Sequence, residues 1–175
     1  MIDEPWIDEL VKQEIAFVPI CVPRHQIQEV MRVGLNEIVS VLKEQGIETV
    51  GPWMTHHHYL NLDEFNCDIC VPVARPVTPQ GRVRPGILPS RKVARAVHRG
   101  PYNELAQAWR ALMNWAAVER LHTCIDFFEC YVKGPESSAD PAQWETMLSF
   151  PLMDLLFPTI KLCPKAHERF RSQQL

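Results

Sequence analysis

Glu129 is a carboxylate set inside a largely apolar, aromatic run, residues 125–132 (IDFFECYV). Strand side chains alternate between two faces, so Phe127, Glu129 and Tyr131 point the same way. An ionised carboxylate is costly to bury without a partner. Aromatic walls beside an acid can bind a lipophilic cation through hydrophobic and cation–π interactions. The run therefore predicts a pocket for lipophilic, often cationic molecules. A structural ion pair with a Lys or Arg, or an edge-strand acid facing water, explains the same pattern.

Two chemical roles are open to Glu129. As a counter-ion for a bound cation, it should stay ionised. As a general base, it should have a pKa raised toward neutrality by its apolar setting, so that it can take a proton from water. The sequence does not separate these roles.

Tryptophan and histidine side chains supply further candidates. Trp109 lies on the inward stripe of a predicted helix, which favours a core position. Trp53 and Trp115 are placed more suitably for a cleft. His56 and His58 share one strand face, but two histidines without a third ligand make a weak metal site. We therefore expect no metal and no cofactor.

Cys67 and Cys70 suggest a zinc or redox site by their spacing. In a strand, three residues of separation places them on opposite faces, whereas chelation or a disulfide needs both sulfurs to converge. No second pair stands at the spacing of a zinc ribbon. Free structural thiols in a reducing compartment are the expectation.

Composition points to an ordinary globular chain. The 175 residues include 18 basic and 21 acidic side chains, and 46% are hydrophobic. A net charge of −3 predicts no direct binding to nucleic acid. No apolar run reaches the roughly 18 residues of a spanning helix, and the acidic start, residues 1–5, lacks a signal-peptide layout. We expect no membrane contact and a cytoplasmic location.

One pattern of elements occurs twice along the chain. The first copy predicts a strand, a helix and two strands at residues 12–22, 27–45, 54–60 and 65–73. The second predicts them at residues 92–98, 103–120, 125–133 and 145–152. We interpret residues 1–175 as one domain with repeats at about 11–74 and 90–152. A Pro- and Arg-rich connector joins them, and the first dozen residues and residues 153–175 are extensions.

Landmarks of the two copies align, His57 with Glu129 and Tyr59 with Tyr131. Two β-α-β-β units related by a pseudo-twofold axis predict an α+β fold. It would have a curved antiparallel sheet with two helices on one face and a ligand cleft on the other. His57 and Glu129 would face each other across that cleft. Two stacked ferredoxin-like units with a filled interface are the alternative.

Several ordered motifs resemble the GyrI-like small-molecule-binding domain, which is also the effector-binding part of many AraC- and MerR-type regulators. They are HRGPY at residues 98–102, Glu129-Cys130-Tyr131 followed by Pro135, Trp144-Glu145-Thr146, and Gly51-Pro52 opening a strand that closes at Pro72. The resemblance covers about residues 11–152. It implies a two-repeat fold with a ligand cleft, an acid at Glu129 and aromatic walls. His57 stands where the family commonly has Tyr.

The family includes sensors of lipophilic cations, gyrase inhibitors, and stand-alone members similar to hydrolases of cyclopropane-bearing toxins. We expect a stand-alone protein that senses or sequesters lipophilic, often cationic molecules. The predicted ligand-binding residues are Glu129, Tyr131, Phe127, His57, Tyr59, Trp53, Trp109 and Trp115. In a hydrolase, Glu129 would be catalytic, and Tyr131 or His57 would stabilise the oxygen that gains negative charge. A gyrase-inhibiting interaction protein is the third expectation. Because the repeats leave no room for a helix-turn-helix, a DNA-binding regulator partner would be a separate protein.

Overall fold

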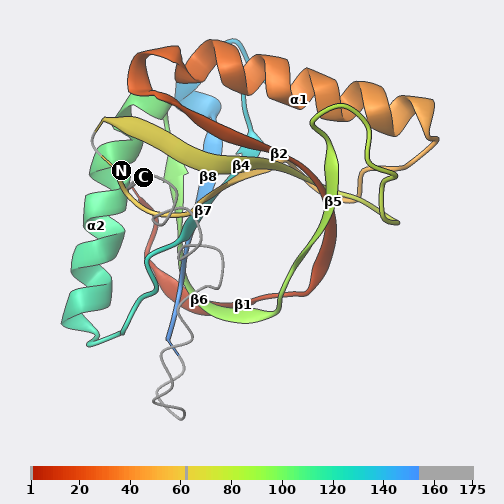
Figure 1. The fold of residues 1–175 in the computed structure, drawn as a ribbon. Helices are drawn as coiled ribbons and strands as arrows, with labels where there is room; N and C mark the ends of the chain where they lie inside the picture. Colours follow the sequence, from red (N-terminus) through yellow and green to blue (C-terminus); the bar gives the residue numbers. More distant parts are fainter. Residues whose placement is uncertain (1, 62, 154–175) are drawn as a thin grey trace, which may run out of the picture.

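Eight strands of the described chain form one antiparallel sheet that curls until it resembles half of a barrel (Figure 1). The computed structural model describes residues 2–61 and 63–153. The strands are β1 (Trp6–Leu10), β2 (Gln13–Pro23), β3 (Met54–His57), β4 (Glu64–Pro72), β5 (Arg84–Leu88), β6 (Arg91–Arg99), β7 (Phe127–Lys133) and β8 (Glu145–Pro151). The α-helices are α1 (Ile27–Glu44) and α2 (Leu105–Val118), and short 3-10 turns are η1 (Arg24–Gln26), η2 (Tyr102–Glu104) and η3 (Pro141–Gln143).

The β-α-β-β order predicted from the sequence occurs twice, as β2-α1-β3-β4 and as β6-α2-β7-β8. Across the sheet the strands lie in the order β1-β6-β8-β7-β3-β4-β2-β5. The order within one repeat is therefore reversed in the other, on either side of the central β3–β7 pair, as a pseudo-twofold axis requires. The two repeats share one continuous sheet, which confirms the predicted α+β fold with a curved sheet.

Both helices pack on the outer side of the curl, one over each repeat (Figure 1). α1 lies against β2 and β4, and α2 lies against β6. Helical spacing places Gly34, Ile38 and Leu42 on the buried face of α1. Gly34 permits the close approach of α1 to the sheet, because a Cβ atom there would lie 2.5 Å from Cδ1 of Ile69 on β4.

Hydrophobic side chains gather in three clusters. One lies under α1 and includes Ile69, and a second lies under α2 and includes Leu148. The third includes Met54, Cys70 and Phe128 on the opposite face of the sheet, inside the curl. Strand alternation therefore divides the core between the two faces of the sheet.

The predicted placement of Cys67 and Cys70 on opposite faces of the strand is confirmed. Cys67 lies in the cluster under α1, whereas Cys70 lies in the cluster on the opposite face. Both thiols are free and buried, and burial raises the pKa of Cys67 to about 12. Neither sulfur has the exposure or the low pKa of a reactive thiol.

Two edge strands were not predicted. β1 lies in the segment interpreted as an N-terminal extension and pairs with β6. β5 lies in the segment interpreted as a connector and pairs with β2. Each edge strand pairs on one side only, so little burial marks its sequence. Pro85 and Gly86 also make β5 look like a turn, although an edge strand tolerates both.

Other boundaries also differ from the expectation. β3 ends at His57 rather than at Leu60, because the chain bends at residues 58–59. Apart from Met153, the predicted C-terminal extension lies outside the described residues. Within the described ranges, neither helix is long and apolar enough to cross a bilayer.

Candidate ligand-binding site

The site lies where the two repeats meet, on β3 and β7. In this antiparallel pair, Thr55 stands opposite Glu129, and His57 stands opposite Phe127. His57 and Glu129 are therefore diagonal neighbours about the pseudo-twofold axis. Their side chains are in contact, with His57 Nε2 lying 3.5 Å from Glu129 Oε2, rather than facing each other across an open cleft.

The face of the sheet that carries these side chains differs from the expectation. We expected the ligand cleft on the face opposite the helices. Glu129 instead points toward α2, because Trp109 of that helix donates a hydrogen bond to it. The cross-strand neighbour of Glu129 on β8 is Leu148, which packs in the cluster under α2. The parity of positions along β7 thus assigns Phe127, Glu129 and Tyr131 to the helix-bearing face.

Glu129 accepts hydrogen bonds at both carboxylate oxygens. The indole Nε1–H of Trp109 donates to Oε1 over 2.7 Å. The hydroxyl of Tyr131 donates to Oε2 over 2.8 Å. The Glu129 side chain is 12% exposed, and among the described residues its ion-pair partner is His57, with no Lys or Arg in that role. Within the described residues, Glu129 therefore does not form the structural ion pair with a Lys or Arg that was the alternative interpretation.

Thr55 connects the other members of the site. Its Oγ1 lies 3.0 Å from Nε2 of His57 and 3.3 Å from the hydroxyl of Tyr131, and Thr55 is buried. Glu129, Tyr131, Thr55 and His57 thus form a closed ring of polar contacts on the sheet. Such a network is stable in a low-dielectric setting only when its members satisfy one another.

Aromatic rings surround this polar ring. The ring of Trp53 stacks on that of Tyr131 at 4.1 Å, and Tyr102 meets the same ring edge-on at 5.4 Å. Phe127 stacks on His57 at 4.5 Å, and Trp109 meets Phe127 edge-on at 4.7 Å. The carboxylate therefore lies within an aromatic enclosure, which is the setting that binds organic cations.

The charge state of the site follows from these contacts. Burial acts to raise the pKa of Glu129, but the hydrogen bond and charge of His57, together with the donors on Trp109 and Tyr131, outweigh it and lower this pKa. Burial and the nearby Glu129 charge raise the pKa of Tyr131 well above its usual value. Glu129 is thus an anion and Tyr131 a neutral donor at physiological pH.

Six of the eight predicted ligand-binding residues come together here: Glu129, Tyr131, Phe127, His57, Trp53 and Trp109. Tyr59 lies elsewhere, since it is exposed and its hydroxyl contacts Glu64 and Asn66. Trp115 packs in the cluster under α2.

Sequence reasoning missed Thr55 and Tyr102. Thr55 carried a usable signal, because it precedes His57 by two positions and strand alternation puts both on one face. Tyr102 lies in η2, in the HRGPY motif, and no periodicity directs its ring toward Tyr131.

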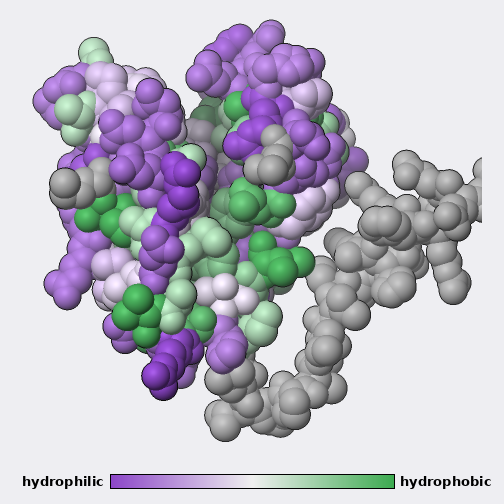
Figure 2. All heavy atoms as spheres, turned by 90° about the vertical axis from the view of Figure 1, so that its left-hand side faces the viewer, coloured by the Kyte–Doolittle hydropathy of each residue, from purple (hydrophilic) through white to green (hydrophobic). Residues whose placement is uncertain are grey.

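The site is partly accessible, since the rings of Trp53, Tyr102 and Trp109 are each partly exposed. In Figure 2, the side of the molecule that carries α2 faces the viewer and is hollowed between two largely polar lobes, with hydrophobic residues below them. A separate surface pocket of about 480 Å³ is lined in part by Lys133, Trp144 and Glu145. The ring of Trp144 lies 4.7 Å from that of Tyr102, so this pocket borders the aromatic enclosure without including Glu129.

Solved structures share this fold. The crystal structure of the EcmrR C-terminal domain has a TM-score of 0.77 at 20% identity, over 87% of this chain and 98% of that one. EcmrR in a DNA complex has a TM-score of 0.79 at 19% identity, over 87% of this chain. The present chain spans 58% of the length of that EcmrR chain.

Two further structures with this fold are a hydrolase and a protein with a bound ligand. A hydrolase encoded by lin2189 from Listeria innocua has a TM-score of 0.64 at 13% identity, over 86% of this chain and 92% of that one. SAV2435 bound to tetraphenylphosphonium has a TM-score of 0.62 at 12% identity, over 87% of this chain and 96% of that one. At these identities the likeness establishes the fold alone.

No protein with a curated description matches this sequence. The model of the GyrI-like small molecule binding domain matches residues 36–153, which is well over half of the chain. That stretch contains β3, β4, β6, α2, β7 and β8, and with them every residue of the site described above. The chain therefore belongs to the GyrI-like small molecule binding domain family.

Proposed function

We propose that this protein binds lipophilic organic cations at the aromatic enclosure, with Glu129 as the counter-charge. One observation carries the proposal: Glu129 is an anion held by neutral donors and one histidine, with no Lys or Arg paired to it among the described residues. Among the described residues, the carboxylate therefore has His57 as its ion-pair partner and no permanently charged side chain beside it. A bound organic cation can supply the missing positive charge.

The energetics favour a large, delocalised cation over a small one. A small ammonium ion would lose its hydration on entering an aromatic site, whereas a lipophilic cation gains from burial of its own apolar surface. Each ring face that meets the cation adds about 0.5–2 kcal/mol. At about 8 Å and an effective dielectric constant of about 20, attraction to the carboxylate adds about 2 kcal/mol, or roughly thirtyfold in affinity.

The comparisons support this proposal without testing it. SAV2435, which has the same fold, is described as bound to tetraphenylphosphonium, a lipophilic cation. EcmrR, which shares the fold in its C-terminal domain, is described in a complex with DNA. We therefore infer a sensing or sequestering role for residues 1–175 as one domain.

The hydrolase alternative draws support from the lin2189 neighbour. The state of Glu129 argues against it, because a general base works best when its pKa lies near the operating pH. The contacts of Glu129 lower its pKa instead. A binding role needs the anion that these contacts stabilise.

The test is a titration with tetraphenylphosphonium, followed by tryptophan fluorescence, since Trp53 and Trp109 lie in the site. We expect saturable binding by the wild type and about thirtyfold weaker binding by Glu129→Gln. Glu48→Gln, which removes an exposed acid elsewhere, should bind like the wild type. Tetraphenylborate, with the same shape and the opposite charge, should not bind.

Two outcomes would contradict the proposal. Equal affinity of wild type and Glu129→Gln for the cation would show that the carboxylate is not the counter-charge. Equal affinity for cation and anion would show that the site selects shape alone. In parallel, incubation with a cyclopropane-bearing compound tests turnover; product formation that is lost in Glu129→Gln would favour the hydrolase.

A further inference from the structure

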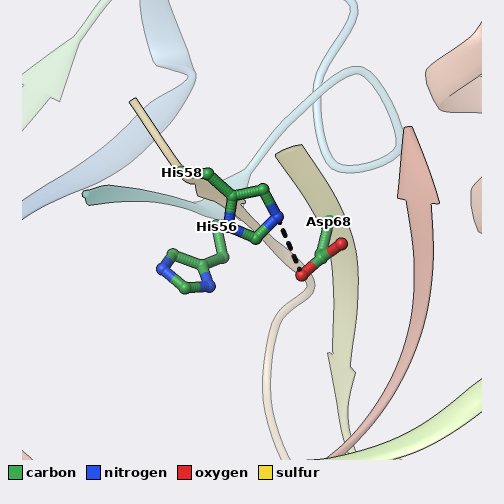
Figure 3. A group of neighbouring side chains, drawn as sticks. All are labelled: His56, His58 and Asp68. Carbon is green, nitrogen blue, oxygen red and sulfur yellow. Dashed lines mark ion pairs between the residues drawn. The ribbon is translucent and has the colours of Figure 1, made fainter. Parts of the chain in front are cut away.

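A second group of chemistry-bearing side chains lies on the opposite face of the same strand. His56 of β3, His58 just beyond it, and Asp68 of β4 each present one ligand atom, and these atoms all lie within 4.8 Å of one another (Figure 3). His58 Nε2 lies 3.3 Å from Asp68 Oδ2, and the two imidazole rings meet edge-on at 5.0 Å. The three side chains come from two neighbouring strands and converge on one point.

Strand geometry explains the convergence. His56 and His58 share a face because they are two positions apart, and that face is opposite to the one that carries His57. The β3–β4 register then places Asp68 directly across from His56. The sequence predicted only the two histidines, and the third ligand comes from the pairing of strands.

A surrounding shell orients His56. Its Nε2 lies 3.0 Å from Oδ2 of Asp126, and Arg91 holds that carboxylate through contacts of 2.6 and 3.2 Å. The ring of His56 also stacks on Phe128 at 4.3 Å. With Nε2 engaged by Asp126, the ring has Nδ1 left for a ligand. A histidine fixed by a carboxylate behind it is the usual arrangement in protein zinc sites.

One of the three ligand separations already suits a tetrahedral ion. Ligands that lie about 2.0–2.2 Å from zinc are separated from one another by about 3.3–3.6 Å. The His58–Asp68 separation of 3.3 Å already agrees with this value. The remaining separations, which are up to 4.8 Å, must shorten by side-chain rotation when an ion binds. The side chains of His58 and Asp68 are 39% and 17% exposed, so an ion from solvent can reach them.

We propose that His56, His58 and Asp68 form a binding site for one divalent first-row transition ion, with Zn²⁺ as the best match. Two imidazoles and one carboxylate are ligands of intermediate softness, which suits zinc better than the oxygen-seeking Mg²⁺ or Ca²⁺. The fourth position is open to water. This proposal departs from our sequence-based expectation of no metal, which rested on the missing third ligand.

The test uses the untagged protein, so that no added histidines bind metal. Zn²⁺ affinity is measured by competition with a chromophoric chelator, and Co²⁺ serves as a spectroscopic probe of coordination. We expect one ion per chain and visible Co²⁺ bands of a low-coordinate site. Thiolate-to-cobalt charge transfer should be absent, because no cysteine belongs to the site.

Variants assign the ligands. Asp68→Asn and His58→Ala should each weaken Zn²⁺ binding by at least about tenfold, and Asp126→Asn by about 10–100-fold through loss of His56 orientation. His25→Ala, which removes an exposed histidine of η1, should leave the affinity unchanged. Circular dichroism without metal checks that each variant is folded. If His58→Ala fails this check, Asp68→Asn still tests the proposal, because it keeps the side-chain volume.

The proposal fails if the wild type binds no Zn²⁺, or if Asp68→Asn and His58→Ala bind as tightly as the wild type. It also fails if the Co²⁺ spectrum shows thiolate ligation, since the metal would then lie on a cysteine. Loss of binding confined to His25→Ala would place the ion on η1 instead.

Discussion

At the scale of single residues, the contacts of Glu129 satisfy the hydrogen bonds of its carboxylate and leave its negative charge in place. Trp109 and Tyr131 donate hydrogen bonds to its oxygens, and His57 Nε2 lies 3.5 Å from Oε2. The donors hold the carboxylate in place but, being neutral, do not cancel its charge. This is how a buried anion can be both part of a stable core and a partner for a cation.

Substitutions at Glu129 should separate the contribution of its hydrogen bonds to stability from the contribution of its charge. Glu129→Gln keeps an acceptor for Trp109, and the hydroxyl of Tyr131 can turn to donate to Thr55. We expect a loss of about 1 kcal/mol in the free energy of unfolding. Glu129→Leu leaves the indole N–H of Trp109 unpaired and should cost about 2–3 kcal/mol. Urea unfolding of both variants measures this, and equal losses would show that the hydrogen bonds do not matter.

The pH dependence of stability follows from the same contacts. Because folding lowers the pKa of Glu129, ionised Glu129 stabilises the fold. Its contribution should be fully present above the ordinary value of 4.5 and should be lost as the pH falls through the lower folded value. The difference in unfolding free energy between wild type and Glu129→Gln, measured against pH, should therefore stay constant down to about pH 5 and shrink only below it. A difference that changes already near neutral pH would reveal a raised pKa and favour the general-base role.

At the scale of elements, β3 is the strand on which both sites depend. Its odd-numbered positions, Thr55 and His57, face the helices and the proposed ligand site. Its even-numbered position His56 faces the inside of the curl and the proposed metal site. A short central strand therefore serves two chemistries, because alternate side chains point to opposite faces.

The contact between α1 and β4 depends on Gly34. Gly34→Ala gains up to about 1 kcal/mol of helix propensity, but its Cβ would crowd Cδ1 of Ile69, the movable end of a side chain. We expect these terms to offset to within about 1 kcal/mol. Gly34→Leu should lose about 1–3 kcal/mol or more by overpacking. Thermal melting gives both values, and a neutral Gly34→Leu would show that α1 does not pack closely at this position.

At the scale of the whole molecule, the pseudo-twofold axis passes through the β3–β7 pair, so the proposed ligand site forms where the repeats join. Neither repeat can form it alone: Thr55 and His57 come from the first, and Glu129, Tyr131 and Trp109 come from the second. If the proposed ligand binds at this network, its binding is linked to the pairing of the two halves.

The edges of the sheet should also matter for the whole fold. β1 covers β6, contributes Leu10 to the inner cluster, and brings Asp8 to Arg95. Removal of residues 2–11 exposes the β6 edge and should cost about 3 kcal/mol of stability and promote self-association. Calorimetry and light scattering measure the two effects. A truncated chain as stable and monomeric as the full one would show that β1 is dispensable.

The sequence by itself determined the two β-α-β-β repeats, the opposite faces of Cys67 and Cys70, and Glu129 between two aromatic rings. These depend on local periodicity, which the chain carries within each element. The tertiary structure alone decided which face of the sheet receives the helices, and hence that Trp109 donates to Glu129. It also decided that Tyr59 lies apart and that Asp68 joins His56 and His58. Such contacts depend on strand register and on helix docking, which bring distant positions together and leave no trace in local periodicity.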